Sequence, residues 1–310
     1  MRVLITGGAG FIGSHLADEL LAEHHHVTVL DNLQTGRQEN VPDGAEWVEA
    51  SITDRDVLRG VMADHGIDTV AHCAASYADR TDWTRDTQTN VQGTVNVVQL
   101  SEELGVQRLL YLQTALCYGH DPLDGLPSRP LPVDHPIRPD NSYAITKTAA
   151  ERFIQHSSLD WVSLRLANVY GPRNLSGPIP TFYKRISESQ PCVVTDSRRD
   201  FVFINDLLAV AVRALEGTGS GVYHVSSGTD YAIREAYEAV AAALGKPDAP
   251  VSFVPRPPDD APSILLDPIL TQFAFDWEPV VPFRTGIDLA VAHYRATGVD
   301  QTFTHLSLKG

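Results

Sequence analysis

Cysteine is scarce in this sequence. Only 3 of the 310 residues are cysteines, and Cys73, Cys117 and Cys192 include no Cys-x-x-Cys pair of the kind used by metal and redox sites. An odd, widely spaced set also gives no disulfide framework. We therefore expect three buried, reduced thiols in a protein of a reducing compartment.

Long apolar runs and basic clusters are also missing. No run approaches the roughly 18 apolar residues of a membrane span. Met1 is followed at once by a strand-like segment, which leaves no room for a signal peptide. Basic residues number 24 against 39 acidic ones, for a net charge of −15. These absences predict a cytoplasmic protein with neither a membrane nor a nucleic-acid partner.

The consecutive histidines His24, His25 and His26 do not predict a metal site. They lie between the first expected helix and the second expected strand, where neighbouring side chains point in different directions. We expect a solvated loop there, and we expect no metal in this protein.

What the sequence does have is a glycine-rich turn near its start. The apolar run 2–6 is typical of a strand buried on both faces. It leads directly into Gly7, Gly10 and Gly13, after which apolar residues recur every four positions, as in a helix. A second strand-like run then ends on Asp31. This order of strand, glycine turn, helix, strand and acid is the fingerprint of a dinucleotide-binding unit.

Each of these residues has a physical reason to be there. Gly7 allows a sharp turn, Gly10 allows the backbone to approach a pyrophosphate, and Gly13 allows the helix to pack closely on the strand. The start of the helix offers N–H groups and partial positive charge to the phosphates. Asp31 is placed to accept hydrogen bonds from a ribose and to repel an extra 2′-phosphate. The expected cofactor is therefore NAD rather than NADP.

Strand-like and helix-like segments alternate through the first half of the chain, which predicts an α/β fold with a Rossmann-like, doubly wound parallel sheet. The expected strands are 2–6, 27–31, 46–49, 69–73, 108–113 and 161–166, and the later helices are 54–62, 87–104 and 141–154. After Asn168 the rhythm breaks into short strands near 193–194, 201–203 and 222–225 and helices near 205–215, 233–244 and 283–296. We expect residues 1–168 to form the NAD-binding domain. Residues 169–310 should form mainly a smaller mixed α/β substrate domain, with some segments returning to the first.

Tyr143 and Lys147 are the first candidates for chemistry. Four residues apart on an expected helix, they share a face. A tyrosine, with a pKa near 10, is a poor base unless positive charge favours its phenolate. A nearby lysine and the positive ring of NAD⁺ would provide that charge. The pair alone is common on ordinary helices, but its place downstream of the glycine turn favours a general base.

These features resemble those of one enzyme family. The Gly-x-x-Gly-x-x-Gly spacing and the Tyr-x-x-x-Lys pair are similar to those of extended short-chain dehydrogenases/reductases. Further stretches resemble the NAD-dependent epimerase/dehydratase family, which acts on nucleotide sugars, and the resemblance covers nearly the whole chain. These stretches are 31–37, 72–75, Asn90, 114–119, 143–147, 164–168 and 199–202.

The resemblance implies a set of site residues and a homodimer formed through the helices of Asn90 and Tyr143. Thr114, four residues before Tyr118-Gly119, would bridge the reacting hydroxyl. The implied cofactor contacts are Gly7, Gly10, Phe11, Ile12, Gly13, Asp31, Asn32, Ser51, Ile52, Ala74, Asn90, Gln113, Tyr143 and Lys147. The implied contacts with a nucleotide-diphosphate sugar are Tyr77, Asn168, Arg199 and Arg256, together with Asp259 or Asp260. Arg198 is left open between a phosphate contact and a surface charge.

The residues after Thr114 bear on the reaction. Members of this family oxidise the sugar, usually at C4. The 4,6-dehydratases then need an acid and a base, typically Asp-Glu after the Ser/Thr, and decarboxylases usually keep the glutamate. Ala115 and Leu116 transfer no protons, which favours a 4-epimerase acting through a transient 4-keto sugar. Residues 77–80 remain an alternative source of acid and base, so a dehydratase, a decarboxylase, a net oxidoreductase and a non-catalytic dinucleotide sensor stay open.

Overall fold

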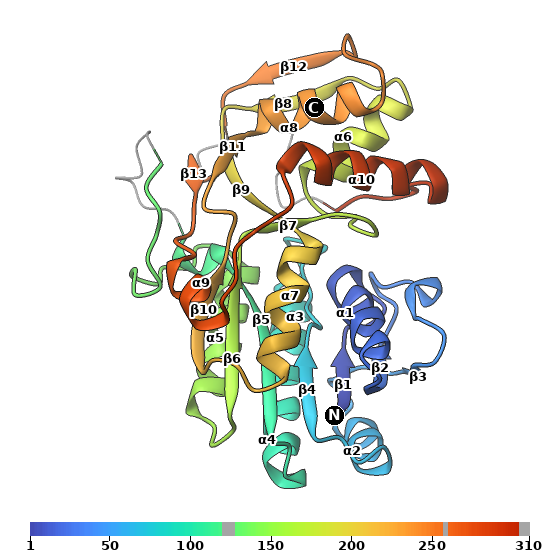
Figure 1. Cartoon of the computed structure of the whole chain (residues 1–310), viewed down its shortest axis with the longest axis vertical. Coiled ribbons are helices and arrows are strands. Elements are labelled where there is room, and N and C mark those ends of the chain that lie inside the picture. The colour runs from blue at the N-terminus through green and yellow to red at the C-terminus, as the bar shows by residue number, and fades with distance from the viewer. Residues whose placement is uncertain (120–127, 257–259, 304–310) are drawn as a thin grey trace.

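A seven-stranded parallel sheet fills the lower part of the computed structural model, which describes residues 1–119, 128–256 and 260–303 (Figure 1). The strand order is β10-β6-β5-β4-β1-β2-β3. The strands are β1 (Arg2–Thr6), β2 (His26–Asp31), β3 (Glu46–Glu49), β4 (Thr69–His72), β5 (Arg108–Thr114), β6 (Trp161–Leu166) and β10 (Gly221–Val225). The order reverses between β1 and β4. A ligand is expected at such a switch point, beyond the carboxyl ends of the strands.

Helices cover both faces of this sheet, as expected for a doubly wound fold. The apolar residues of β1 alternate between two cores: Val3 and Ile5 pack with α1 (Phe11–Ala22) and α7 (Ile204–Leu215), and Leu4 packs on the opposite face. That second core includes side chains of α2 (Arg55–Asp64), α4 (Thr94–Leu104) and α5 (Ser142–His156). Burial on both faces explains why these strands are continuous apolar runs without polar alternation.

For two elements the structure shows detail that the sequence did not indicate. Residues 222–225 belong to β10, which pairs with β6 in parallel, with Gly221 opposite Val162. This strand therefore extends the large sheet, and α7 returns with it to pack beside α1 (Figure 1). The expected helix 87–104 is in fact two segments, a π-helix η2 (Thr87–Gly93) and α4, and a short helix α3 (Trp83–Asp86) directly precedes them.

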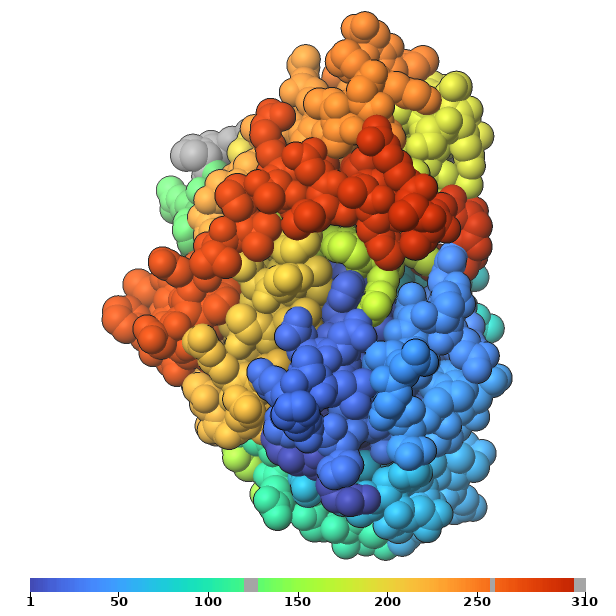
Figure 2. All heavy atoms as spheres, turned by 45° about the vertical axis from the view of Figure 1, so that its right-hand side comes forward, coloured from blue at the N-terminus to red at the C-terminus, as the bar shows by residue number. Residues whose placement is uncertain are grey.

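Smaller sheets and further helices form the upper layer. One four-stranded sheet contains β7 (Asn168–Tyr170), β9 (Arg198–Phe203), β11 (Asp230–Ala232) and β13 (Ser263–Ile264), and β8 (Cys192–Thr195) pairs with β12 (Val251–Val254). The helices of this layer are α6 (Pro178–Ser187), α8 (Ile233–Ala243) and α10 (Phe283–Thr297), whereas α9 (Ile269–Phe275) packs beside β10 at the edge of the large sheet (Figure 1). The 3₁₀ turns η1 (Gln38–Asn40) and η3 (Ala115–Tyr118) belong to the N-terminal half of the chain. Figure 2 shows α10, in red, crossing the surface above α7 and the N-terminal half.

The three cysteines are unpaired, as their odd number and wide spacing predict. All three thiols are free; Cys117 and Cys192 are buried and Cys73 is partly buried. Within residues 1–119, 128–256 and 260–303, no helix has the length and apolar character needed to cross a bilayer.

Candidate active site

A cavity of about 1540 Å³ opens at the carboxyl ends of the central strands and is closed on its other side by residues of the upper layer. It brings together most of the site residues predicted from the sequence. Those that line it are Gly7, Gly10, Phe11, Ile12, Gly13, Asp31, Asn32, Ser51, Ile52, Ala74, Tyr77, Gln113, Thr114, Tyr143, Lys147, Asn168 and Arg199. Asn90 and Arg256 are not among its lining residues, and Asp259 lies outside the described residues.

The glycine turn forms a cradle that no larger residue fits. Gly7 has a φ of +69°, and a Cβ there would lie 2.7 Å from the backbone of Ala74. A Cβ on Gly13 would lie 2.8 Å from the Cα of Gly8. Gly10, the N-cap residue of α1, supplies no side-chain cap, so the first-turn N–H groups of the helix remain available to an anion. This backbone fits the diphosphate of a dinucleotide.

Asp31 is held rigidly at the end of β2. Its side chain is 7% exposed, and its carboxylate accepts hydrogen bonds from the backbone N–H groups of Ala9 (3.1 Å) and Leu33 (2.8 Å). Burial raises the pKa of this carboxyl, and the two hydrogen bonds oppose that rise. Gly36 packs so closely that a Cβ on it would lie 2.8 Å from Asp31 Oδ1. The carboxylate thus has a fixed position at the edge of the cavity.

Tyr143 and Lys147 both reach the cavity from α5. The Lys147 ammonium lies over the ring of Tyr111, with Nζ 4.0 Å from the ring centroid, and burial lowers the pKa of Lys147 to about 7. Burial also raises the pKa of Tyr143, and Tyr77 and Asp86 raise it further. Burial therefore dominates the pKa of Tyr143 in the protein alone, and the phenolate expected from the sequence depends on the positive ring of NAD⁺ as well as on Lys147.

Gln113 ties the strand of Thr114 to the helix of Lys147. Its Nε2 donates to the backbone carbonyl of Lys147 (3.0 Å), and its Oε1 accepts from the N–H of Thr114 (2.8 Å). The Thr114 oxygen accepts from the N–H of Leu116 (3.2 Å), which caps η3 and fixes the side chain. Ala115 and Leu116 also line the cavity, so the wall beside Thr114 is apolar.

Asn90 lies behind the cavity wall and is 1% exposed. Its amide nitrogen donates to the Ser76 carbonyl and to Thr146 Oγ1, both at 3.0 Å, and its oxygen accepts from the Ser76 N–H at 2.7 Å. Any effect of Asn90 on a cofactor therefore passes through the residues that it holds.

Arg199 reaches the cavity from β9 and is engaged by the protein itself. Its Nη1 donates to the carbonyls of Arg198 (2.6 Å) and Ala261 (2.9 Å), and its Nη2 pairs with the carboxylate of Asp260. Burial lowers the pKa of Arg199, and Asp260 opposes this effect. Three acceptors occupy part of a guanidinium that has five N–H donors.

Asp260, one of the two aspartates that the sequence leaves as alternatives, lines the cavity. It is 4% exposed, and its Oδ2 accepts from the hydroxyl of Ser197 at 2.7 Å. Arg256 is partly buried and donates to the backbone carbonyl of Asp260 at 3.0 Å. Arg256 therefore supports the Asp260 segment from outside the cavity.

The residues around the start of β7 and β9 separate into two groups. Asn168 lines the cavity, and its amide donates to the carbonyl of Asp200 at 3.2 Å. Arg198 is not among the lining residues, because its Nε pairs with Asp230 at 3.0 Å. This ion pair with Asp230 is neither of the two alternatives, a phosphate contact and a surface charge, that the sequence leaves open for Arg198.

Two parts of the cavity have no signal in the sequence. Thr302 and Phe303 line it from the C-terminal segment, where the Phe303 N–H donates to the Leu175 carbonyl at 2.8 Å. The Phe303 ring meets that of Tyr77 edge-on, with centroids 6.0 Å apart. Asp86, a buried carboxylate of α3, lines the cavity as well. Neither the segment 302–303 nor Asp86 belongs to a sequence motif, so only the folded structure reveals that they line the cavity.

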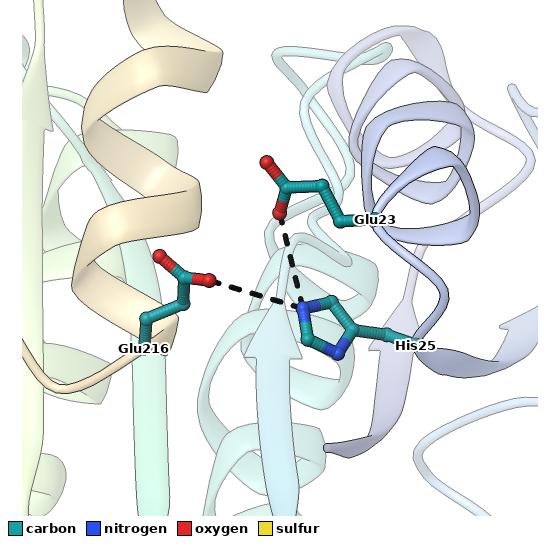
Figure 3. A group of neighbouring side chains, drawn as sticks. All are labelled: Glu23, His25 and Glu216. Atoms are coloured by element: carbon teal, nitrogen blue, oxygen red, sulfur yellow. Dashed lines mark ion pairs between the residues drawn. The ribbon is translucent and has the colours of Figure 1, made fainter.

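A second polar cluster lies away from the cavity (Figure 3). His25 Nε2 is 3.8 Å from Glu23 and 3.9 Å from Glu216, and the three residues are close enough together to hold a metal ion. The ammonium of Met1 donates to Nδ1 at 3.2 Å, which leaves the proton of a neutral imidazole on Nε2, facing the carboxylates. A cation here would lie near that ammonium, so we interpret the cluster as a polar contact between the ends of α1 and α7. His25 is thus partly buried, whereas His24 and His26 are exposed as expected.

Comparison with known proteins gives the family. Residues 3–226 match the model of the NAD-dependent epimerase/dehydratase family. The chain belongs to this family. It is 33% identical to a UDP-glucose 4-epimerase of Mycolicibacterium smegmatis, over 95% of this chain and 99% of the relative. UDP-glucuronic acid decarboxylases of Arabidopsis thaliana also match, at 28% identity.

Solved structures of this family are similar over the whole fold. The Bordetella bronchiseptica enzyme WbmH in complex with NAD⁺ has 47% sequence identity and a TM-score of 0.91, covering 96% of this chain and 99% of that one. The enzyme WbmG of the same organism, in complex with NAD and UDP, has 44% identity and a TM-score of 0.89, covering 99% and 98%. The Rossmann-like fold and the cofactor NAD are thereby confirmed.

Proposed function

We propose that this protein is a nucleotide-sugar 4-epimerase that oxidises C4 of its substrate to a transient 4-keto sugar and then reduces it on the other face. One observation carries the proposal. Thr114, Tyr143 and Lys147 line one cavity, and the two lining residues that follow Thr114, Ala115 and Leu116, have apolar side chains. Such a site suits reversible oxidation without elimination.

The glycine turn and Asp31 would hold the cofactor. First-turn N–H groups of α1 would bind its diphosphate, and Asp31 with Asn32 would accept hydrogen bonds from its adenosine ribose. Ser51, Ile52 and the other predicted lining residues would complete the adenine and nicotinamide sides. NAD⁺ supplies the hydride acceptor and a positively charged ring when it is bound.

Tyr143 would act as the general base and then as the general acid. Its phenol takes the proton of the sugar hydroxyl during oxidation and returns a proton to the same oxygen during reduction. Lys147, on the same helix face, would stabilise the phenolate and hold the nicotinamide ribose. Thr114 would bridge the reacting oxygen, because its own oxygen is fixed by the Leu116 N–H. Burial of Tyr143 makes both positive charges necessary for the phenolate.

Arg199 and Asn168 would contact the substrate diphosphate. The donors of Arg199 that its three protein acceptors leave over suit phosphate oxygens. Asp260 would hold the guanidinium in place, and Tyr77 would lie beside the sugar. The substrate nucleotide is proposed to be UDP, because the relatives named for a substrate act on UDP-sugars and WbmG was crystallised with UDP.

A decarboxylase or dehydratase is the second candidate. Asp79 and Arg80 line the same cavity, so acid and base groups exist outside the Thr114 segment. The two reactions lose carbon dioxide or water, whereas epimerisation leaves the mass unchanged. Incubation with UDP-, dTDP- and GDP-sugars, followed by NMR and mass spectrometry of the products, therefore separates them. A lighter product would reject the epimerase.

The tyrosine gives a direct test of the mechanism. Tyr143→Phe keeps the ring and removes only the ionisable oxygen. We expect a folded variant that binds NAD normally and turns over at least about 100-fold more slowly. Full activity of this variant would reject Tyr143 as the base.

We also propose a cytoplasmic homodimer with a chain divided near residue 168 into an NAD-binding and a substrate-binding domain. The helix pairing expected for the dimer includes α5, which exposes Ile145 (51%) and Phe153 (46%) to solvent. These two side chains lie eight residues apart on one helix face. Light scattering of wild type and of Phe153→Glu would test the dimer, since an unchanged mass for both would exclude this surface.

A further inference from the structure

A ladder of hydrogen bonds lies behind the proposed catalytic tyrosine. Asp86 and Asn90 are one turn apart on one helical segment, and Ser142 and Thr146 are one turn apart on α5. Asp86 Oδ2 accepts from the Ser142 hydroxyl at 2.7 Å, and Asn90 Nδ2 donates to Thr146 Oγ1 at 3.0 Å. Ser142 is followed by Tyr143, and Thr146 is followed by Lys147, the tyrosine and the lysine of the site. The ladder therefore fixes the turn of helix that carries both.

The same two residues hold the loop after β4. The Ser76 hydroxyl donates to Asp86 Oδ1 at 2.8 Å, and the Ser76 N–H donates to Asn90 Oδ1 at 2.7 Å. Ser76 precedes Tyr77, whose ring meets that of Tyr143 edge-on with centroids 6.3 Å apart. Asp86 thus binds the serine that precedes each tyrosine of this pair.

Asp86 also brings charge to the cavity wall. Its side chain is 1% exposed, and its two oxygens accept from hydroxyl groups of serine. Titratable groups that interact with Tyr143 include Tyr77 from the loop after β4, Asp86 from α3 and Tyr111 from β5. Lys147 lines the same cavity from the helix of Tyr143. After burial and Tyr77, Asp86 is the third cause that raises the pKa of Tyr143.

Building on the proposed function, we propose that Asp86 is a positioning residue of the reaction. Its carboxylate fixes the start of α5 against the Tyr77 loop and keeps a negative charge beside the Tyr143 phenol. This charge makes the Tyr143 phenolate a stronger base, which assists the step in which it takes the proton of the sugar hydroxyl. Lys147 and the positive ring of the cofactor stabilise the phenolate, which assists the step in which Tyr143 returns the proton, so Asp86 balances the two directions of a reversible reaction.

Two substitutions separate geometry from charge. Asp86→Asn keeps one acceptor and offers an N–H to the other serine oxygen, so the ladder keeps its shape while the charge is lost. Asp86→Ala removes both the charge and the hydrogen-bond acceptors. Asp82→Asn is the matched control on the same helix, because Asp82 caps α3 by accepting from the Arg85 N–H at 2.9 Å, and asparagine caps helices equally well.

The decisive readout is the titration of Tyr143 itself. Tyrosine labelled with carbon-13 at Cζ is followed by NMR in the NAD-loaded protein, and the Tyr143 signal is assigned from its loss in Tyr143→Phe. We expect Asp86→Asn to lower the titration midpoint by about half a pH unit or more, and Asp82→Asn to leave it unchanged. An unchanged midpoint in Asp86→Asn would overturn the role of the charge.

Turnover tests the positioning role separately. With a substrate that the wild type accepts, the acidic limb of the kcat profile should move to lower pH in Asp86→Asn. Asp86→Ala should lose about tenfold or more in kcat, with KM changed less than about threefold. Wild-type kcat in both variants would overturn the positioning role. If the wild type converts no sugar nucleotide, the proposed function fails, whereas the NMR titration still decides the effect of Asp86.

Discussion

Gly13→Ala tests the cofactor cradle without any knowledge of the substrate. The added Cβ would overlap the backbone of Gly7 and Gly8, at 3.0 Å from the Gly7 carbonyl carbon and 2.8 Å from the Gly8 Cα. Ordinary Cβ contacts lie between 3.4 and 4 Å. The turn has no room to retreat, since the Gly7 N–H is bonded to the Leu30 carbonyl at 2.8 Å and Gly8 packs against Val29, so that a Cβ added to Gly8 would lie 2.7 Å from the Val29 side chain. Overpacking of this kind costs about 1–3 kcal/mol.

The same displacement moves the N–H groups that would bind the diphosphate. We expect calorimetry to show NAD affinity reduced by about 10–100-fold, equivalent to about 1.4–2.8 kcal/mol. Alanine also has a higher helix propensity than glycine, which offsets part of the lost folding stability. Gly60→Ala in α2 measures this propensity gain alone, because nothing lies within 4 Å of a Cβ added there. It should raise the free energy of unfolding by about 0.5–1 kcal/mol. If Gly13→Ala binds NAD as tightly as Gly60→Ala, the cradle does not bind the cofactor.

Three further predictions follow from single contacts. Wild type should bind NAD⁺ at least about tenfold more tightly than NADP⁺, because the fixed carboxylate of Asp31 repels a 2′-phosphate, and equal affinities by calorimetry would contradict this. Arg199→Ala should weaken sugar-nucleotide binding by about 2–3 kcal/mol with little effect on NAD binding. It should also lower the melting temperature, because it leaves Asp260 buried without its partner. The double variant Arg199→Ala with Asp260→Ala should recover part of the lost melting temperature. Burial holds the folded-state pKa of Lys147 at about 7, below its unfolded value of 10.5. Between these two pH values the unfolded chain binds more protons than the folded protein. The free energy of unfolding should therefore rise with pH across this window, by up to roughly 4 kcal/mol. Chemical denaturation at pH 7 and pH 10 should show this rise in wild type and lose it in Lys147→Met.

The first half of the fold could be predicted because its signals are local. A strand buried on both faces is an apolar run, and a phosphate-binding turn needs glycine at fixed spacing, so residues 2–31 carry their own evidence. Asp54 likewise predicts the start of α2, where its side chain accepts from the Val57 N–H at 3.2 Å. Such features depend on neighbours in the sequence and survive any uncertainty about the rest of the chain.

The parts that were missed depend on contacts between distant residues. β10 is a short strand like those of the upper layer, and only its pairing with β6 places it in the large sheet. The sequence leaves Asp259 and Asp260 as alternatives; Asp260 is buried against Arg199, and Asp259 lies outside the described residues. The pKa directions at Tyr143 reflect burial, which no spacing of tyrosine and lysine reports.

Two anionic molecules are proposed to bind to a chain with a net charge of −15, and two of the arginines that line the cavity are already paired with carboxylates. The glycine turn offers backbone N–H groups, which bind phosphate without adding net charge. Arg199 already pairs with Asp260, and Arg173, another lining residue, pairs with Asp18 at 2.7 Å. A guanidinium neutralised in this way attracts distant anions weakly, yet its remaining donors keep a fixed direction. Recognition at this site therefore depends on the geometry of hydrogen-bond donors, and the aspartate partners are part of that geometry.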